Sequence, residues 1–158
     1  MRRAIYPGSF DPFHKGHAYI IEQAALLFDE VTVAVAENSE KKHMFDAEKR
    51  AWLIRKHYYS DQKVITVITT SDLITNVMKA KDIRYMVRGV RNARDFEEES
   101  RLSNCYKSQH TFMETVLLMA PVHLDYVSSS LVKEIAKHKG KWKQWVPDHV
   151  ADALEKRF

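Results

Sequence analysis

Cysteine is almost absent from this sequence, which has a single one, Cys105, in 158 residues. One cysteine excludes an intrachain disulfide and a zinc site built on several thiolates. We interpret Cys105 as a small buried hydrophobic residue rather than as a nucleophile. A free thiol fits a reducing compartment, and we expect a cytoplasmic protein.

Long apolar runs, internal repeats and low-complexity linkers are also lacking. No stretch approaches the roughly 18 apolar residues of a transmembrane helix, so we expect no membrane partner. Arg2 and Arg3 lie near the start of the chain, but the apolar stretch after them is too short for a signal peptide. We therefore expect one domain over residues 1–158.

Charge of one sign is only slightly in excess. Hydrophobic residues make up 45% and charged residues 29% of the chain, as in ordinary globular proteins, and the formal net charge is +4. This balance is compatible with nucleic acid, an acidic membrane or a small polyanion as the ligand. Because no basic helix and no interleaving of aromatic residues with arginines stands out, we expect no nucleic-acid partner.

Short apolar runs alternate with helical patterns along the chain. The predicted strands are residues 3–6, 31–36, 64–68, 83–87 and 115–119, and the predicted helices are 16–28, 46–58, 72–80, 96–110, 128–138 and 147–157, with Asp46, Asp72 and Ser128 as caps and Pro147 in a first turn. This alternation predicts an α/β fold, a Rossmann-like doubly wound sheet of about five parallel strands with helices on both faces. Ligands of such sheets bind beyond the carboxyl ends of the strands, here in the loops 7–15, 37–45, 68–72, 88–96 and 120–130.

The first of these loops ends in His14-Lys15-Gly16-His17, at the start of the first predicted helix. Free N–H groups at a helix start favour a phosphate, and two histidines three residues apart face the same side. Gly16 leaves the backbone open to a ligand. The alternatives are a capping role, two solvent-exposed side chains or a zinc pair, which no third ligand completes. We interpret the histidines as phosphate ligands.

Three other loops carry basic or hydroxyl side chains. Lys41-Lys42 follows the second strand, Arg88-Gly89-Val90-Arg91 leaves the fourth, and Ser128-Ser129-Ser130 heads the fifth helix. Paired lysines are usually solvated, arginines near Asp95 and Glu99 can form a structural salt-bridge knot, and serines at a helix start are usually caps. The same groups suit a polyphosphate, because guanidinium groups, hydroxyls and free N–H groups donate to phosphate oxygens.

The segment from Tyr6 to Pro12, followed by His14 and His17, resembles the HxGH nucleotidyltransferase superfamily and, within it, the bacterial phosphopantetheine adenylyltransferases. The similarity continues through the lysine, arginine and serine segments and covers essentially the whole chain. This sequence departs from the family's pattern at Asn38-Ser39-Glu40, which lacks a proline, at Glu98, where a tyrosine is common, and at Tyr106-Lys107, where Asn-Arg is usual.

The resemblance implies a set of site residues. The implied catalytic residues are His17, Lys41, Arg91 and Ser129. The implied ATP-binding residues are Ser9, Phe10, His14, His17, Gly89, Val90, Arg91, Glu99, Leu124, Asp125, Tyr126, Val127, Ser128, Ser129 and Ser130, and the implied acceptor-binding residues are Ser9, Lys41, Leu73, Ile74 and Arg88. In this assignment His17 donates to the α-phosphate, and Lys41 bridges it to the attacking phosphate.

The resemblance also implies a reaction, the transfer of AMP from ATP to 4′-phosphopantetheine, which gives dephospho-coenzyme A and pyrophosphate. Mg²⁺ would arrive with ATP, so we expect no protein-bound metal. A homohexamer and feedback binding of coenzyme A are implied by analogy only. The nearest alternative is a related transferase that uses CTP, or another acceptor such as nicotinamide mononucleotide.

Overall fold

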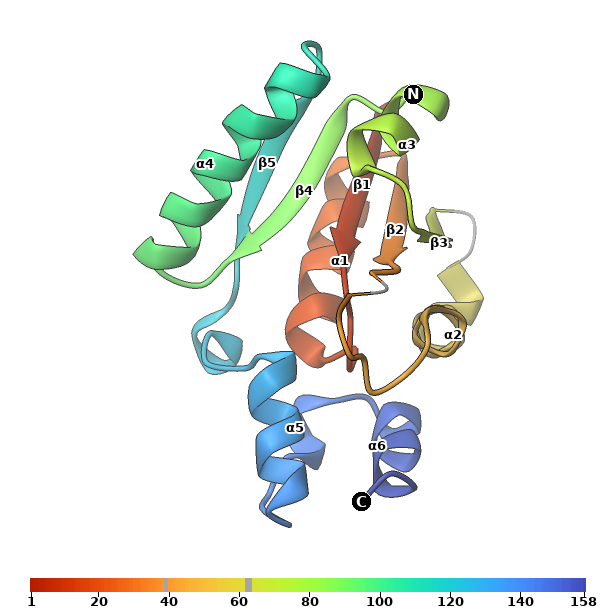
Figure 1. Cartoon of the computed structure of the whole chain (residues 1–158), viewed down its shortest axis with the longest axis vertical. Coiled ribbons are helices and arrows are strands. Elements are labelled where there is room, and N and C mark those ends of the chain that lie inside the picture. The colour runs from red at the N-terminus through yellow and green to blue at the C-terminus, as the bar shows by residue number, and fades with distance from the viewer. Residues whose placement is uncertain (39, 62–63) are drawn as a thin grey trace.

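Five parallel strands form one sheet in the order β3-β2-β1-β4-β5 (Figure 1). The computed structural model describes residues 1–38, 40–61 and 64–158, so Ser39 of the predicted second loop lies outside the described residues. The strands are β1 (Arg3–Gly8), β2 (Glu30–Ala36), β3 (Ile65–Thr70), β4 (Tyr85–Val90) and β5 (Glu114–Met119). The predicted fold class and all five predicted strands are confirmed, with ends that differ by at most three residues.

Six α-helices lie within the described residues. They are α1 (Lys15–Leu27), α2 (Ala47–His57), α3 (Ile74–Ala80), α4 (Ala93–Gln109), α5 (Ser129–Lys137) and α6 (Asp148–Glu155), and single 3-10 turns occur at Tyr59–Asp61, Val122–Leu124 and Lys143–Trp145. Right-handed crossovers in this strand order put α1 and α2 on one face of the sheet and α3 and α4 on the other. Figure 1 shows α5 and α6 beyond the carboxyl ends of the strands, where they close one end of the molecule.

Most predicted helix caps are present. The Asp46 carboxylate accepts the backbone N–H of Lys49 at 2.7 Å, and the Ser128 hydroxyl accepts that of Leu131 at 3.1 Å. The prediction that Asp72 caps the third helix is wrong. Leu73 is the cap residue of α3, and the Asp72 carboxylate instead accepts the N–H of Leu73 itself at 2.7 Å, one residue too early for a cap.

Three further predictions about helices need correction. α4 begins three residues earlier than predicted, because the Asn92 side chain accepts the backbone N–H of Asp95 at 3.0 Å and so caps the helix. Pro147 is the cap residue of α6 and lies before its first turn, since the helix starts at Asp148. Cys105 is exposed, not buried, because α4 presents mostly polar side chains and buries only Glu99 fully.

Alternate residues of the strands enter two separate cores, as a sheet covered on both faces requires. Ala4 and Tyr6 of β1 belong to the core that α1, α2, α5 and α6 share. Ile5, between them in sequence, packs in the second core with Met78 and Met86. The fully buried strands explain why the sequence shows continuous apolar runs there rather than alternation.

The pairing of β1 with β4 is much shorter than the other strand pairs. Only two residue pairs are in register, Ala4 with Tyr85 and Ile5 with Met86, whereas β1–β2, β2–β3 and β4–β5 each pair over six. This junction is also where the strand order reverses, the place where α/β sheets bind their ligands. Beyond these two residue pairs, β1 and β4 are not paired at their carboxyl ends, which leaves an opening between them.

Candidate active site

A cavity of about 300 Å³ lies at this opening, at the carboxyl edge of the sheet. It is lined by the end of β1, the first turns of α1, the end of β4, α4, the segment after β5 and the start of α5. The lining residues are Tyr6, His14, Gly16, His17, Ile20, Gly89, Arg91, Asp95, Glu98, Glu99, Ala120, Leu124, Val127, Ser128 and Ser129. The volume falls at the lower end of the range for small-molecule sites.

His14 and His17 cap α1 and at the same time line the cavity. The backbone N–H of His17 donates to Nδ1 of His14 at 3.3 Å, and the backbone N–H of His14 donates to Nδ1 of His17 at 3.2 Å. The two rings stack with their centroids 3.6 Å apart. In a neutral imidazole whose Nδ1 accepts, the proton resides on Nε2. Each ring therefore carries one donor, at Nε2.

Both histidines are neutral at pH 7. Burial, with a smaller effect from the Arg91 guanidinium, lowers the pKa of His14 from 6.5 to about 3. Burial, then the neighbouring His14, Arg88 and Arg91, lowers the pKa of His17 well below 6.5. The pair is therefore suited to donating hydrogen bonds to an anion rather than to accepting protons from a substrate.

The histidine rings are held by close packing. A Cβ atom at Gly16 would lie 2.9 Å from Cε1 of His14, so only glycine lets that ring fold over the helix start. Phe10 adopts a positive φ of 50° and meets the His17 ring edge-on, with centroids 4.9 Å apart. Phe13 stacks on His17 at 6.0 Å. The aromatic packing fixes the direction of the donors before any ligand binds.

Arg91 is oriented by two neighbours on the other side of the cavity. Its Nε donates to Asp95 at 2.9 Å, and its Nη1 donates to the Val127 carbonyl at 3.4 Å. The hydrogen bond with Asp95 raises the pKa of Arg91 and lowers that of Asp95, so both are charged. Ser129, the first residue of α5, donates its hydroxyl to the Pro12 carbonyl at 2.9 Å. This bond ties α5 to the histidine loop.

Arg88 and Glu99 form the salt-bridge knot that the sequence left open as an alternative. Nε and Nη2 of Arg88 donate to the two Glu99 oxygens at 2.8 and 2.7 Å, and Nη1 donates to the Pro7 carbonyl at 2.8 Å. Burial opposes the charge of Arg88, but the hydrogen bonds outweigh it and raise the pKa of the guanidinium. Glu99 lines the cavity, whereas Arg88 does not. The proposed contact of Arg88 with the acceptor stays a prediction.

The remaining predicted acceptor residues lie outside this cavity. Lys41 is exposed in the loop between β2 and α2, and within the described residues no hydrogen bond or ion pair engages its side chain. Leu73 is 47% exposed, whereas Ile74 is 8% exposed and packs in the second core. A contact of Ile74 with a ligand would have to use its backbone.

The structure brings nine of the predicted ATP-binding residues to the cavity wall. These are His14, His17, Gly89, Arg91, Glu99, Leu124, Val127, Ser128 and Ser129, whereas Ser9, Phe10, Val90, Asp125, Tyr126 and Ser130 do not line it. Six lining residues were absent from the predicted set, namely Tyr6, Gly16, Ile20, Asp95, Glu98 and Ala120. The helical spacing of Ile20 from His17 was the signal available for one of them.

Tyr6 is a lining residue with an unusual environment. Burial raises the pKa of its hydroxyl to about 12, so the group stays protonated.

Within the described residues, no group of three or more His, Cys, Asp and Glu side chains is arranged to hold a metal ion. The same part of the chain contains no helix that is long and apolar enough to cross a membrane.

Paired histidine donors at a helix start, at the switch point of a parallel sheet, define the class of Rossmann-like nucleotidyltransferases. The family model described as Cytidylyltransferase-like matches residues 5–135 of the chain. The protein is also 42% identical over 157 residues to the phosphopantetheine adenylyltransferase of Latilactobacillus sakei, an alignment that covers 99% of the chain and 95% of the relative. The chain belongs to the phosphopantetheine adenylyltransferase family.

Two further relatives of the same name are similar along their whole length. The phosphopantetheine adenylyltransferase of Carboxydothermus hydrogenoformans is 40% identical over 160 residues, with 100% of the chain and 97% of the relative covered. That of Leptospira biflexa is 41% identical over 155 residues, with 98% and 96% covered. The resemblance read from the sequence motifs is thereby confirmed.

Proposed function

We propose that this protein transfers AMP from ATP to 4′-phosphopantetheine and releases dephospho-coenzyme A and pyrophosphate. The observation that carries the proposal is the pair of neutral histidines that cap α1 inside the cavity, opposite an oriented arginine. The acceptor, phosphopantetheine, and the transferred adenylyl group are those in the name of relatives that are about 40% identical over the full chain.

The reaction requires little acid–base catalysis by the protein. An oxygen of the acceptor phosphate attacks the α-phosphorus of ATP, and the bond from that phosphorus to the bridging oxygen breaks as pyrophosphate leaves. The nucleophile is already an anion at neutral pH, so no general base is required. The protein must hold two polyanions in line and stabilise charge at the α-phosphate.

In this mechanism His17 donates Nε2–H to the α-phosphate as negative charge builds on it, and His14 braces the loop and approaches the triphosphate. Arg91 holds the β- and γ-phosphates together with Ser129, Ser130 and the free N–H groups at the start of α5. Mg²⁺ bound together with ATP would neutralise charge on the leaving pyrophosphate. Gly89 and the residues from Leu124 to Val127 face the nucleoside.

The acceptor is proposed to lie on the side of Lys41 and Leu73. Lys41 neutralises the attacking phosphate and reaches toward the α-phosphate, and Ser9 orients the same group. Arg88 and the Leu73–Ile74 turn hold the pantetheine arm. Lys41 is exposed and has no ion pair among the described residues, which supports its role, because its ammonium can approach two phosphates without breaking such a pair.

The direct test incubates the protein with ATP, Mg²⁺ and 4′-phosphopantetheine and detects dephospho-coenzyme A by mass, together with stoichiometric pyrophosphate. Parallel reactions replace ATP by CTP, or the acceptor by nicotinamide mononucleotide. A higher kcat/KM with either substitute would contradict the proposal. Salt-dependent binding to a random oligonucleotide, without turnover of any nucleotide, would instead favour a nucleic-acid-binding function.

We also propose a homohexamer in the cytoplasm that binds coenzyme A as a feedback ligand. Exposed apolar side chains support self-association, among them Phe112 at 76%, Val122 at 85% and Met119 at 69% exposure. Sedimentation equilibrium measures the assembly, and a monomer at micromolar concentration would contradict it. Competition between coenzyme A and ATP in a binding assay tests the feedback site.

A further inference from the structure

We propose that Asp11 is a positioning residue that fixes the Lys41 loop against the histidine loop, and that Lys133 of α5 holds Asp11 in place for that task. The inference rests on the proposed role of Lys41 at the acceptor phosphate. It is carried by four side chains, Asp11, Lys133, His43 and Arg50, of which Asp11 and Arg50 are buried, and none of the four lines the cavity.

The Asp11 carboxylate accepts hydrogen bonds from the turn that follows Lys41. One oxygen accepts the backbone N–H of Met44 at 2.8 Å, and the other accepts that of Phe45 at 3.1 Å. Asp11 is only 3% exposed, so these bonds are made away from solvent. A buried carboxylate that accepts two consecutive N–H groups fixes both the position and the direction of that turn.

Arg50 holds the same loop at both of its ends. Its Nη1 donates to the Ala36 carbonyl at 2.9 Å, where the loop leaves β2, and its Nε donates to the Phe45 carbonyl at 2.9 Å, where the loop enters α2. Nη1 also donates to the Ser9 carbonyl at 2.6 Å. The side chain is 1% exposed. Through Arg50, both ends of the loop that bears Lys41 are therefore tied to Ser9, two residues before Asp11.

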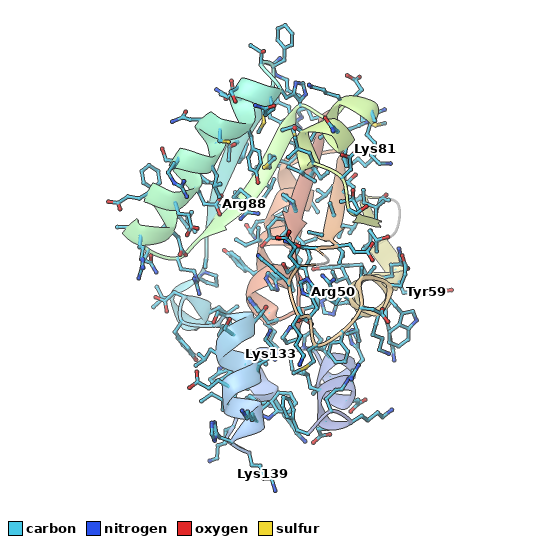
Figure 2. The ribbon with its side chains drawn as sticks, viewed as in Figure 1. Arg50, Tyr59, Lys81, Arg88, Lys133 and Lys139 are labelled. Atoms are coloured by element: carbon cyan, nitrogen blue, oxygen red, sulfur yellow. The ribbon has the colours of Figure 1, made fainter. Side chains whose placement is uncertain are left out.

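Lys133 connects this network to the helix that carries the phosphate-binding serines. Its Nζ lies 3.5 Å from Oδ2 of Asp11, and Nδ1 of His43 lies 3.7 Å from the same oxygen. Lys133 stands four residues after Ser129, so both project from one face of α5. Ser129 contacts Pro12 and Lys133 contacts Asp11. Figure 2 labels Lys133, which belongs to α5, and Arg50, which belongs to α2.

The arrangement explains how an otherwise unsupported lysine can be catalytic. Lys41 has no side-chain partner within the described residues, so its place depends on the backbone of its loop. A misplacement of about 1 Å can cost on the order of 10² in rate. Asp11 supplies the restraint, and through Lys133 it keeps the loop in register with the helix that holds the nucleotide phosphates.

The first measurement does not depend on any substrate. Asp11→Asn replaces one accepting oxygen by an NH₂ group that faces a backbone N–H, and the matched control Asp152→Asn makes the same change at an exposed position on α6. We expect amide hydrogen exchange at Met44 and Phe45 to become at least about tenfold faster in Asp11→Asn alone. Unchanged exchange at both amides would overturn the proposal.

The second measurement asks whether Asp11 acts through Lys41. We expect Asp11→Asn to lower kcat/KM for the acceptor about 30-fold and to leave the Kd of ATP within about threefold. In a Lys41→Ala background the same substitution should have less than about a threefold effect, because the lysine it positions is gone. A full 30-fold loss in that background would reassign Asp11 to general stability.

Lys133 keeps the proposal testable if Asp11→Asn fails to fold. Lys133 has a side chain that is 32% exposed, so its substitution is tolerated more easily. We expect Lys133→Met to lower kcat/KM for the acceptor about fivefold and Lys133→Arg to restore it within about twofold, since arginine keeps the charge. Equal losses in both variants, or none in either, would contradict the assignment. Absence of turnover in the wild type would refute the proposed function instead.

Discussion

The two sides of the site differ in how their side chains are held. On the proposed nucleotide side the principal side chains are engaged with the protein: His14 with His17, Arg91 with Asp95, and Ser129 with Pro12. On the acceptor side Lys41 is exposed and unpaired within the described chain, and Leu73 is half exposed. The nucleotide side is preorganised by side-chain contacts, whereas the acceptor side is preorganised by the backbone.

This difference indicates which kinetic constant each side of the site should control. Donors that are already oriented need no rearrangement when charge develops at the α-phosphate, which is where stabilisation of the transition state counts most. A lysine on a fixed loop keeps its own rotamer freedom and can follow the acceptor phosphate. Substitutions on the nucleotide side should therefore change kcat, and those on the acceptor side should change KM for the acceptor.

The largest expected effect comes from His17→Ala. We expect kcat to fall by about 10² or more, while ATP binding stays within about tenfold, because the lost donor acts mainly on the transition state. The variant also loses one capping hydrogen bond, at a cost of about 1 kcal/mol in the free energy of unfolding. Steady-state kinetics and a thermal melt on one sample check both. His17→Asn, which keeps a donor, should recover part of the rate, and near-wild-type turnover in the alanine variant would remove His17 from the mechanism.

Arg88→Ala tests the acceptor side. We expect KM for phosphopantetheine to rise much more than KM for ATP, and the free energy of unfolding to fall by about 3 kcal/mol, because the Glu99 carboxylate, 11% exposed, loses its partner. The double variant Arg88→Ala/Glu99→Ala serves as the control, since it leaves no unpaired charge. If it recovers the acceptor KM together with the stability, Arg88 is only the structural partner of Glu99.

Gly16→Ala sharpens the comparison on the nucleotide side. The added Cβ would lie 2.9 Å from the His14 ring, which must move and take its Nε2–H donor with it. We expect kcat to fall about tenfold with little change in the acceptor KM. Lys15→Ala, at the exposed neighbouring position, should behave as the wild type. A selective rise in the acceptor KM would show that the two sides are not separable in this way.

The last expected effect is in the dependence of stability on pH, which asks nothing of either substrate. The folded-state pKa of His14, about 3, lies below the unfolded value of 6.5, so the unfolded chain binds the extra proton first. The stabilising contribution is complete above pH 6.5 and is lost as the pH falls toward 3, at up to about 1.4 kcal/mol per pH unit for one proton. Urea unfolding from pH 7 to pH 4 measures the slope. His14→Asn, which still caps the helix, should reduce the slope to the part that His17 contributes, because the pKa of His17 is also lowered well below 6.5. An unchanged slope would show that His14 does not titrate in this way.

Much of this architecture was predictable from the sequence because the responsible forces are local. Apolar runs bounded by helical patterns predicted all five strands, and Asp46 and Ser128 predicted their helix starts through side-chain bonds to residues three positions on. Asn92 caps α4 by the same rule, but residues 88–96 were predicted to be a ligand-binding loop and the helix was predicted to begin at Phe96. Cys105 was misplaced because residue type alone does not say which face of α4 it occupies.

What could not be predicted depends on contacts between distant residues. Arg50 looks like any surface arginine of a basic helix, yet it meets Ser9, 41 residues away, and is almost fully buried. Asp11 reads as part of a tight turn, and its bonds to Met44 and Phe45 exist only once β1 and β2 are paired. The resemblance to a known family implied roles for the site residues, but it did not predict the buried contacts of Asp11 or Arg50.

The short seam between β1 and β4 divides the sheet into a three-stranded and a two-stranded piece. Each piece has long pairings inside it, so the seam is the line along which partial unfolding should cost least free energy. The proposed nucleotide cavity straddles that line, with Tyr6 on one piece and Gly89 on the other. A bound nucleotide would therefore contact both pieces of the sheet and oppose their separation. We expect saturating ATP to slow hydrogen exchange in both strands together, with a gain in stability set by its free concentration over Kd.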